Sequence, residues 1–193
     1  LTGDVGGAGL VYLGPVTADR VSLFGIGWKR DSVGREIDSM SVGAVAGSRV
    51  VRSQLGSQLD NAEIFQASTG SLGETAVATI VFNGTGGSPT PTLVVGVCRL
   101  AGYTAAATDS DSSINITTPI SIAHAGKARL FVAQTIADND TITVSGITVV
   151  LANSSPNTLA TVSIGLDDAG PGSVTYVLST GTFRGVSASW SLA

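Results

Sequence analysis

The sequence predicts an all-β fold, an antiparallel β-sandwich of jelly-roll type with about ten to twelve strands and little or no helix. The first observation is the composition: of 193 residues, 43% are hydrophobic, only 12% are charged and 25 are glycines. The second is a repeated alternation of apolar and polar residues, which is the pattern of half-buried antiparallel strands. The third is the turn signals that separate these segments about every 8–14 residues.

Two segments of the chain are the most strongly apolar. One of them, residues 91–103, is expected to be a strand covered on both sides, and so is the shorter segment Lys127–Thr135. Residues 91–103 form the more apolar of the two and predict the central strand of the sandwich. Cys98 in this segment is expected to be a small buried residue, and Arg99 must reach a partner or solvent because an unpaired buried guanidinium is costly. The other segment, Asp19–Trp28, is expected to close the core with Trp28.

The remaining strands are expected from shorter patterns along the chain. These segments are Glu36–Val42, Ala44–Val51, Glu63–Ala67, Glu74–Phe82, Ile114–Ile122, Lys127–Thr135, Thr141–Ser145, Thr158–Leu166, Ser173–Ser179 and Val186–Leu192. Pro119 interrupts one of them and predicts an edge strand. Residues 104–113 are small and polar and predict a loop. At Gly146 the alternation changes phase, which is the pattern of a β-bulge.

The domain organisation follows from the glycine-rich beginning of the chain. Residues 1–17 predict an N-terminal arm that docks on a partner, and residues 18–193 predict a single β-sandwich domain. The candidate docking residues of the arm are Leu10, Val11, Tyr12 and Leu13. The alternative is that this short apolar piece is the first edge strand of the same domain.

Charge and hydropathy disfavour several classes of partner. The net charge is −4 and the ten Lys and Arg residues are scattered, whereas nucleic-acid binding requires concentrated basic surface. No run of about 18 apolar residues is present, so no membrane span is predicted. The residues from Leu1 onward carry no signal-peptide pattern. One cysteine excludes an internal disulfide.

Catalytic chemistry finds little support in the residues. A hydrolase triad would have to use His124, the only histidine, and no Gly-x-Ser-x-Gly elbow is followed by a helix. Cysteine catalysis requires an exposed thiolate, whereas Cys98 lies in the most apolar segment. One Cys and one His cannot supply the ligands of a zinc site. We therefore expect no catalytic residues, no enzyme activity and no cofactor.

Two acidic stretches leave calcium as an alternative. Asp109 and Asp111 flank Ser110, and Asp138 and Asp140 flank Asn139. Oxygen-rich loops of this kind suit hard cations, but neither continues into an EF-hand loop. Asp and Asn are also common in turns because they bind their own backbone. These residues support an alternative function, a carbohydrate- or receptor-binding sandwich assisted by calcium.

The order of segments resembles a module of tailed-bacteriophage structural proteins. Ala18-Asp19-Arg20 leads into an apolar strand that ends at Trp28, and Ser-Met-Ser-Val-Gly follows at 39–43. Residues 95–103 read Val-Gly-Val-Cys-Arg-Leu-Ala-Gly-Tyr, a Thr/Ala/Asp-rich stretch follows, and residues 186–190 read Val-Ser-Ala-Ser-Trp. The sequence departs from the module at Ala46, where a second glycine is usual, and in residues 60–73.

The resemblance implies a jelly-roll-like sandwich displayed on a virion, with no catalytic residues to carry over. The function expected is that of a capsid decoration (cement) protein or a surface-fibre component, located in the virion. The partners expected are other copies of the chain, for example in a trimer, and virion proteins such as the capsid shell. Strand faces of Ser and Thr fit this expectation, because they can pack against another subunit at a smaller desolvation cost than charged faces.

Overall fold

The structure is a computed structural model. It describes residues 6–29, 36–53, 60–83, 92–100, 102, 104, 106–114, 120–124, 128–135, 142–145, 148–154, 161–167, 172–178 and 183–191. These residues contain sixteen β-strands and no helix, and all the strand pairs are antiparallel. The predicted antiparallel β-sandwich is therefore confirmed, with more strands than the sequence indicated. The jelly-roll connection pattern stays a prediction.

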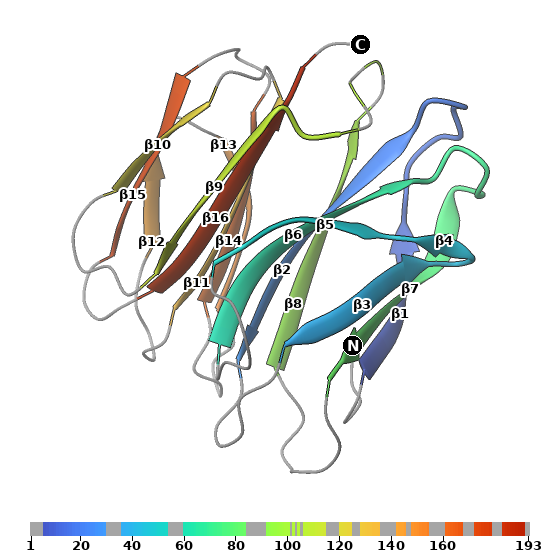
Figure 1. Cartoon of the computed structure of the whole chain (residues 1–193), viewed down its shortest axis with the longest axis horizontal. Helices are drawn as coiled ribbons and strands as arrows, with labels where there is room; N and C mark the ends of the chain where they lie inside the picture. The colour runs from blue at the N-terminus through green and yellow to red at the C-terminus, as the bar shows by residue number, and fades with distance from the viewer. Residues whose placement is uncertain are drawn as a thin grey trace.

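The strands form four hydrogen-bonded sheets, which we number I to IV (Figure 1). Sheet I contains β1 (Gly6–Tyr12), β7 (Thr75–Phe82), β3 (Ile37–Val42) and β4 (Val45–Ala46), in that order. Sheet II contains β5 (Ser48–Arg52), β6 (Asp60–Ser68), β2 (Val21–Lys29) and β8 (Thr92–Leu100). Sheet III contains β13 (Thr148–Ser154), β14 (Thr161–Asp167), β11 (Ala128–Thr135), β16 (Phe183–Trp190) and β9 (Asp109–Ile114). Sheet IV contains β10 (Ile120–His124), β15 (Gly172–Leu178) and β12 (Ile142–Ser145).

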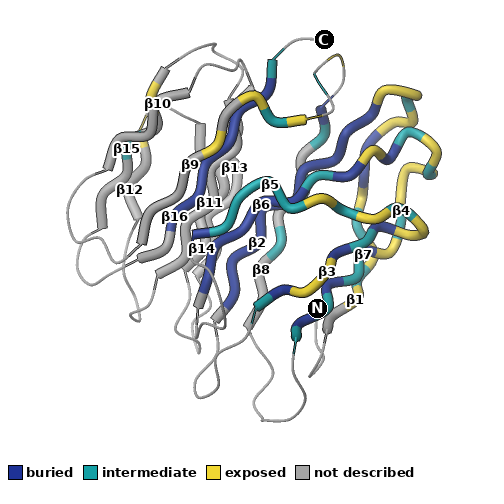
Figure 2. The backbone as a smooth tube through the Cα atoms, in the orientation of Figure 1, coloured by how far each residue is buried: buried dark blue, intermediate teal, exposed yellow. Residues whose placement is uncertain are grey.

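Sheet II is the middle layer, with a hydrophobic core on each face (Figure 2). The core toward sheet I contains Leu13, Phe24, Ile26, Trp28, Ile37, Met40, Val42, Phe65, Ala67, Ala78, Ile80 and Phe82. The core toward sheet III contains Val21, Leu23, Ala62, Ile64, Leu100, Val186, Ala188 and Trp190. β2 lies between the two cores, and every residue from Val21 to Trp28 is buried; apart from Ser22 these residues are apolar or glycine.

The central strand of this layer is β2 and not β8. β2 pairs along its whole length with β6 on one side and β8 on the other, whereas β8 pairs with β2 alone and lies at the edge of sheet II. Residues 91–103 were predicted as the central strand, and that prediction is wrong. Val95 and Val97 of β8 are only partly buried, so a high apolar content did not mean a central position.

Two tryptophans join the layers. The Trp28 ring meets Phe82 of sheet I edge to face, with ring centroids 5.3 Å apart. Trp190 of sheet III is fully buried against sheet II, and its indole Nε1 donates to the Gln66 Oε1 at 3.0 Å. Each tryptophan therefore combines a large apolar contact with a satisfied N–H group, which buried indoles require.

Three local predictions are corrected. Residues 109–113 belong to β9 and not to a loop. The segment predicted as one strand from Ile114 to Ile122 contains parts of two strands, β9 and β10; each lies at the edge of its sheet, so the predicted edge position is confirmed and the single strand is not. The phase change near Gly146 reflects a change of sheet, from β12 in sheet IV to β13 in sheet III. A register shift does occur in β13, between Val149 and Leu151.

The serine face of β16 is not an intersubunit surface. Ser187 and Ser189 are fully buried, although they lie on the face opposite Val186, Ala188 and Trp190. β16 is therefore covered on both faces within the chain, and the expectation that its Ser face contacts another subunit is wrong there.

Candidate functional site

The outer face of sheet I contains the predicted docking residues. β1 is an edge strand of this sheet and pairs with β7, so Gly6–Tyr12 adopts the alternative that the sequence left open. Because side chains alternate along a strand, the docking residues divide into two groups. Leu10 and Tyr12 are 73% and 63% exposed, whereas Leu13 is 1% exposed and Val11 is packed against the core.

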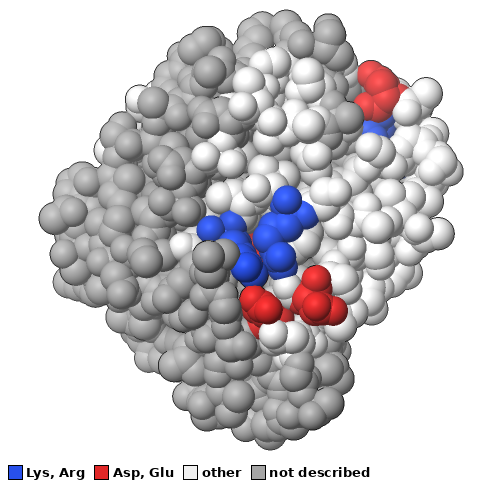
Figure 3. All heavy atoms as spheres, in the orientation of Figure 1, with Lys and Arg blue, Asp and Glu red and all other residues white. Residues whose placement is uncertain are grey.

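The same face continues across β7 and β3. Its paired positions carry no charged residue, and the exposed Asp38 lies at the register shift of β3, next to Ser39. Leu10 lies opposite Val77, which is 46% exposed, and Tyr12 lies opposite Thr75. We call this surface the sheet I face; it consists of Ala8, Leu10, Tyr12, Ser39, Ser41, Thr75, Val77, Thr79 and Val81, all exposed or half-buried. In the space-filling view the charged atoms gather mainly at the centre, and the surface to their right is mostly white (Figure 3).

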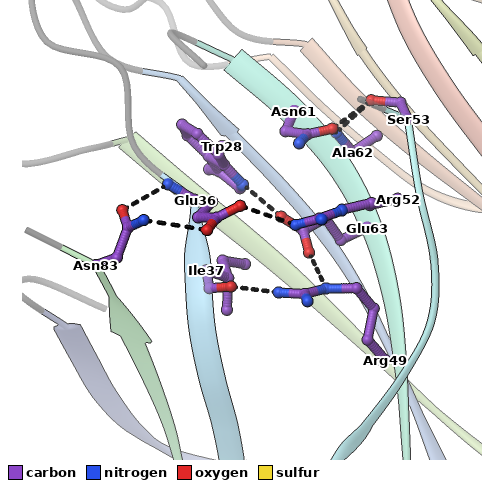
Figure 4. A network of polar contacts seen from close by, with 10 residues as sticks. All are labelled: Trp28, Glu36, Ile37, Arg49, Arg52, Ser53, Asn61, Ala62, Glu63 and Asn83. Atoms are coloured by element: carbon purple, nitrogen blue, oxygen red, sulfur yellow. Dashed lines mark hydrogen bonds and ion pairs between the residues drawn. The ribbon is translucent and has the colours of Figure 1, made fainter. Parts of the chain in front are cut away.

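The central charged patch belongs to a polar network at the junction of sheets I and II (Figure 4). The Glu63 side chain on β6 is fully buried and both of its oxygens accept hydrogen bonds. Oε1 accepts from the Trp28 indole at 3.2 Å, and Oε2 accepts from the Arg49 Nε at 2.7 Å. Arg49 also donates to the carbonyl of Ile37 on β3, which ties β5 of sheet II to sheet I.

A second ion pair extends this network toward solvent. Arg52 Nη1 lies 2.9 Å from the Glu36 Oε2, with both side chains partly exposed. Glu36 also accepts from the Asn83 amide at 3.1 Å, and the Asn83 Oδ1 accepts from the Glu36 backbone N–H. These bonds fix the start of β3 against the end of β7.

Glu63 is a buried carboxyl group whose desolvation is partly offset by the neighbouring charge and hydrogen bonds. Burial raises the pKa of Glu63 above its ordinary value, and the nearby Arg49 charge with the bonds from Trp28 and Arg49 oppose this rise. A raised pKa is typical of general acids. This carboxyl, however, has no exposed surface and both oxygens are occupied, so the arrangement clamps two sheets rather than offering a group to a substrate.

A second polar cluster is centred on Arg20, whose side chain is fully buried. Its guanidinium donates to main-chain carbonyls in two loops, one before β2 and one between β6 and β7. The acceptors are the carbonyls of Gly14 (2.7 Å), Pro15 (3.3 Å), Thr69 (2.7 Å), Leu72 (2.8 Å) and Gly73 (2.9 Å) and the Thr69 hydroxyl (3.1 Å). One planar cation thus joins two loops that are far apart in the sequence.

The two loops held by Arg20 also touch directly. A Cβ placed on Gly70 would lie 2.2 Å from the Ala18 carbonyl oxygen, so this close approach requires glycine. Asp19 in the same region accepts a bond from the Gly102 N–H at 2.9 Å. That bond is the main reason that the pKa of Asp19 is lowered, and the Arg99 charge contributes least. The Nε of Arg99 is buried without a hydrogen-bond partner.

The other candidate sites from the sequence lie on different strands where the structure describes them. Asp109 and Asp111 lie on β9, opposite Ser189 and Ser187 of β16. Asp138 and Asp140 lie outside the described residues. His124 is the last residue of β10, and Cys98 pairs with Leu23 in sheet II. Within the described part of the chain, no three His, Cys, Asp or Glu residues cluster as metal ligands would.

A bilayer-spanning helix is not found among the described residues. Comparison with family models, with curated proteins and with solved structures finds no match to this chain.

Proposed function

We propose that this chain is a non-enzymatic structural component of a bacteriophage virion, a capsid decoration (cement) protein or a surface-fibre component. In this proposal the sheet I face docks on a neighbouring virion protein such as the capsid shell. The observation that carries the proposal is that three large apolar side chains, those of Leu10, Tyr12 and Val77, are exposed together on this face. The resemblance of residues 18–193 to phage structural modules is the reason that we name a phage virion as the particle.

The energetics of such a contact favour this face over the rest of the described surface. Burial of a large apolar side chain contributes about 1.5–3 kcal/mol, and Leu10 and Tyr12 still expose most of their surface. The neighbouring Ser39, Ser41, Thr75 and Thr79 carry hydroxyl groups, which cost less to desolvate than charges and can form bonds across an interface. Contiguous exposed apolar surface of this kind is typical of protein contact sites.

The Val77→Lys substitution tests the docking role. A lysine at the centre of the sheet I face would bury an unpaired ammonium in the contact, so we expect binding to the particle to fall by about tenfold or more. The measurement is rebinding of the purified chain to particles stripped of it, followed by sedimentation and quantification of the bound copies. Particles of the encoding phage that never contain the chain would refute the proposal.

The matched control is Val16→Lys, which introduces the same charge at a valine that is 53% exposed outside the strands of sheet I. We expect this variant to rebind like the unmodified chain. Equal loss in both variants would mean that net charge, and not the sheet I face, governs attachment.

A further inference from the structure

The free edge of β1 is the feature with no role in the contacts described above. β1 is the first strand of sheet I, and among the described strands only β7 pairs with it (Figure 1). An unpaired edge exposes a row of backbone N–H and C=O groups that can pair with another chain.

Most edges in this molecule carry a feature that opposes such pairing, but β1 does not. β4, the opposite edge of sheet I, is only two residues long, and β5 has a register shift between Arg49 and Val51. β1 pairs with β7 over seven residues without a shift, and it contains neither a charged residue nor a proline. Short strands, bulges, charges and prolines are the usual protection of edge strands.

The residues of β1 are complementary to a second copy of β1. The first half of the strand, residues 6–9, reads Gly-Gly-Ala-Gly, and the second half, residues 10–12, reads Leu-Val-Tyr. In an antiparallel pair centred on Gly9, each large residue lies opposite a small one: Leu10 opposite Ala8, Val11 opposite Gly7 and Tyr12 opposite Gly6. A parallel pair in register would instead place Tyr12 beside Tyr12.

We propose that two copies of this chain pair through β1, antiparallel and centred on Gly9, so that sheet I continues across a two-fold axis into the sheet I of the partner subunit. Such an isologous contact closes on itself and leaves no further β1 edge exposed. It also extends the sheet I face across two subunits, which doubles the apolar surface available to a third protein. This inference goes beyond the proposed function and rests on the edge position and the residues of β1.

Mixed-cysteine crosslinking tests the pairing register. We make Ala8→Cys and Leu10→Cys as separate variants and oxidise each alone and after co-refolding the two. A disulfide requires Cβ atoms about 3.5–4.5 Å apart, which directly opposite residues approach and diagonal neighbours do not. We expect a disulfide dimer on a non-reducing gel from the mixture, and only the background of the unmodified chain, which retains Cys98, from either variant alone.

Sedimentation velocity over a dilution series supplies the second readout. Leu10→Lys places a charge opposite Ala8 twice in each dimer, and we expect the dissociation constant to rise about tenfold or more. Val16→Lys is the matched control, and we expect it to dimerise like the unmodified chain. A monomeric unmodified chain, crosslinking in either single variant above background, or a dimer whose mixture does not crosslink would each overturn the β1 pairing.

The outcome is separable from that of the docking proposal. A chain that dimerises through β1 but does not bind particles would remove the virion role and leave this pairing intact. A chain that binds particles as a monomer would remove the β1 pairing and leave the docking role of Val77.

Discussion

Arg20→Met is expected to lower the free energy of unfolding by about 2–6 kcal/mol, because it leaves two buried carbonyls without a donor at about 1–3 kcal/mol each. Methionine fills similar volume but donates no hydrogen bond. The carbonyls of Gly14 and Thr69 would then be buried without the donor that now binds them, whereas those of Leu72 and Gly73 are only partly buried and can turn to water. Urea denaturation followed by tryptophan fluorescence measures this loss, because Trp28 and Trp190 are both buried.

The matched control for Arg20 is Arg52→Met. Arg52 forms one partly exposed ion pair with Glu36, and such pairs contribute about 0–1 kcal/mol. We expect Arg20→Lys to fall between the two variants, because an ammonium cannot reach both loops with a planar fork. If Arg20→Met lowers the free energy of unfolding no more than Arg52→Met does, Arg20 does not stabilise the fold by joining the two loops.

Glu63→Ala is expected to cost about 3–5 kcal/mol, because it leaves the Arg49 guanidinium and the Trp28 N–H without their shared acceptor. Glu63→Gln keeps the shape and does not titrate, so it isolates the effect of charge. Burial raises the pKa of Glu63 above 4.5 in the folded state. The folded chain therefore holds this proton more tightly than the unfolded chain does.

The sign of the pH dependence follows from that difference. The contribution of Glu63 is fully present below the unfolded pKa near 4.5 and is lost as the pH rises through the higher folded pKa. Relative to Glu63→Gln, the unmodified chain should therefore lose stability between these two values, by about 1.4 kcal/mol for each unit of pKa difference. Denaturation of both proteins across this window measures the relative stability.

Asp19→Asn provides a control of opposite sign. The Gly102 N–H lowers the pKa of Asp19, so its contribution is present above 3.8 and is lost as the pH falls through the lower folded pKa. A stability difference between the unmodified chain and Glu63→Gln that rises with pH, as expected for Asp19, would contradict a raised pKa of Glu63.

The elements with strict alternation were predictable from the sequence. β7 alternates from Ala76 to Phe82, and its even positions from Ala78 onward lie in the core as expected. Val186, Ala188 and Trp190 of β16 likewise face one core. In these strands the order of apolar and polar residues predicts which side chains are buried, because successive side chains lie on opposite faces of the strand.

The order of the strands within the sheets was not predictable in the same way. β2 and β8 are both apolar on both faces, and composition favoured β8 as the centre. Sheet II places β2 there, because β2 meets a core on each face and pairs on both edges. The middle position depends on which strands pair with which, and these partners lie far apart in the sequence. The hydropathy of a single segment does not predict them.

The polar clamps were missed for a related reason. Arg20 binds mainly carbonyl groups, which every residue possesses, so its partners leave no signal in the sequence. Glu63 gave a weak signal, since it is a charged residue directly before Ile64 and Phe65 in a predicted strand. The docking role of residues 10–13 stays a prediction, and only the pairing of β1 with β7 shows that Leu10 and Tyr12 face outward.

Electron cryomicroscopy of purified particles tests the central claim, that sheet I is the assembly surface of a virion protein. The account predicts density for the chain on the particle, with Leu10, Tyr12 and Val77 against a neighbouring protein and β1 beside the β1 of a second copy. The account would be contradicted by particles without the chain, or by copies whose sheet I face is open to solvent at every position.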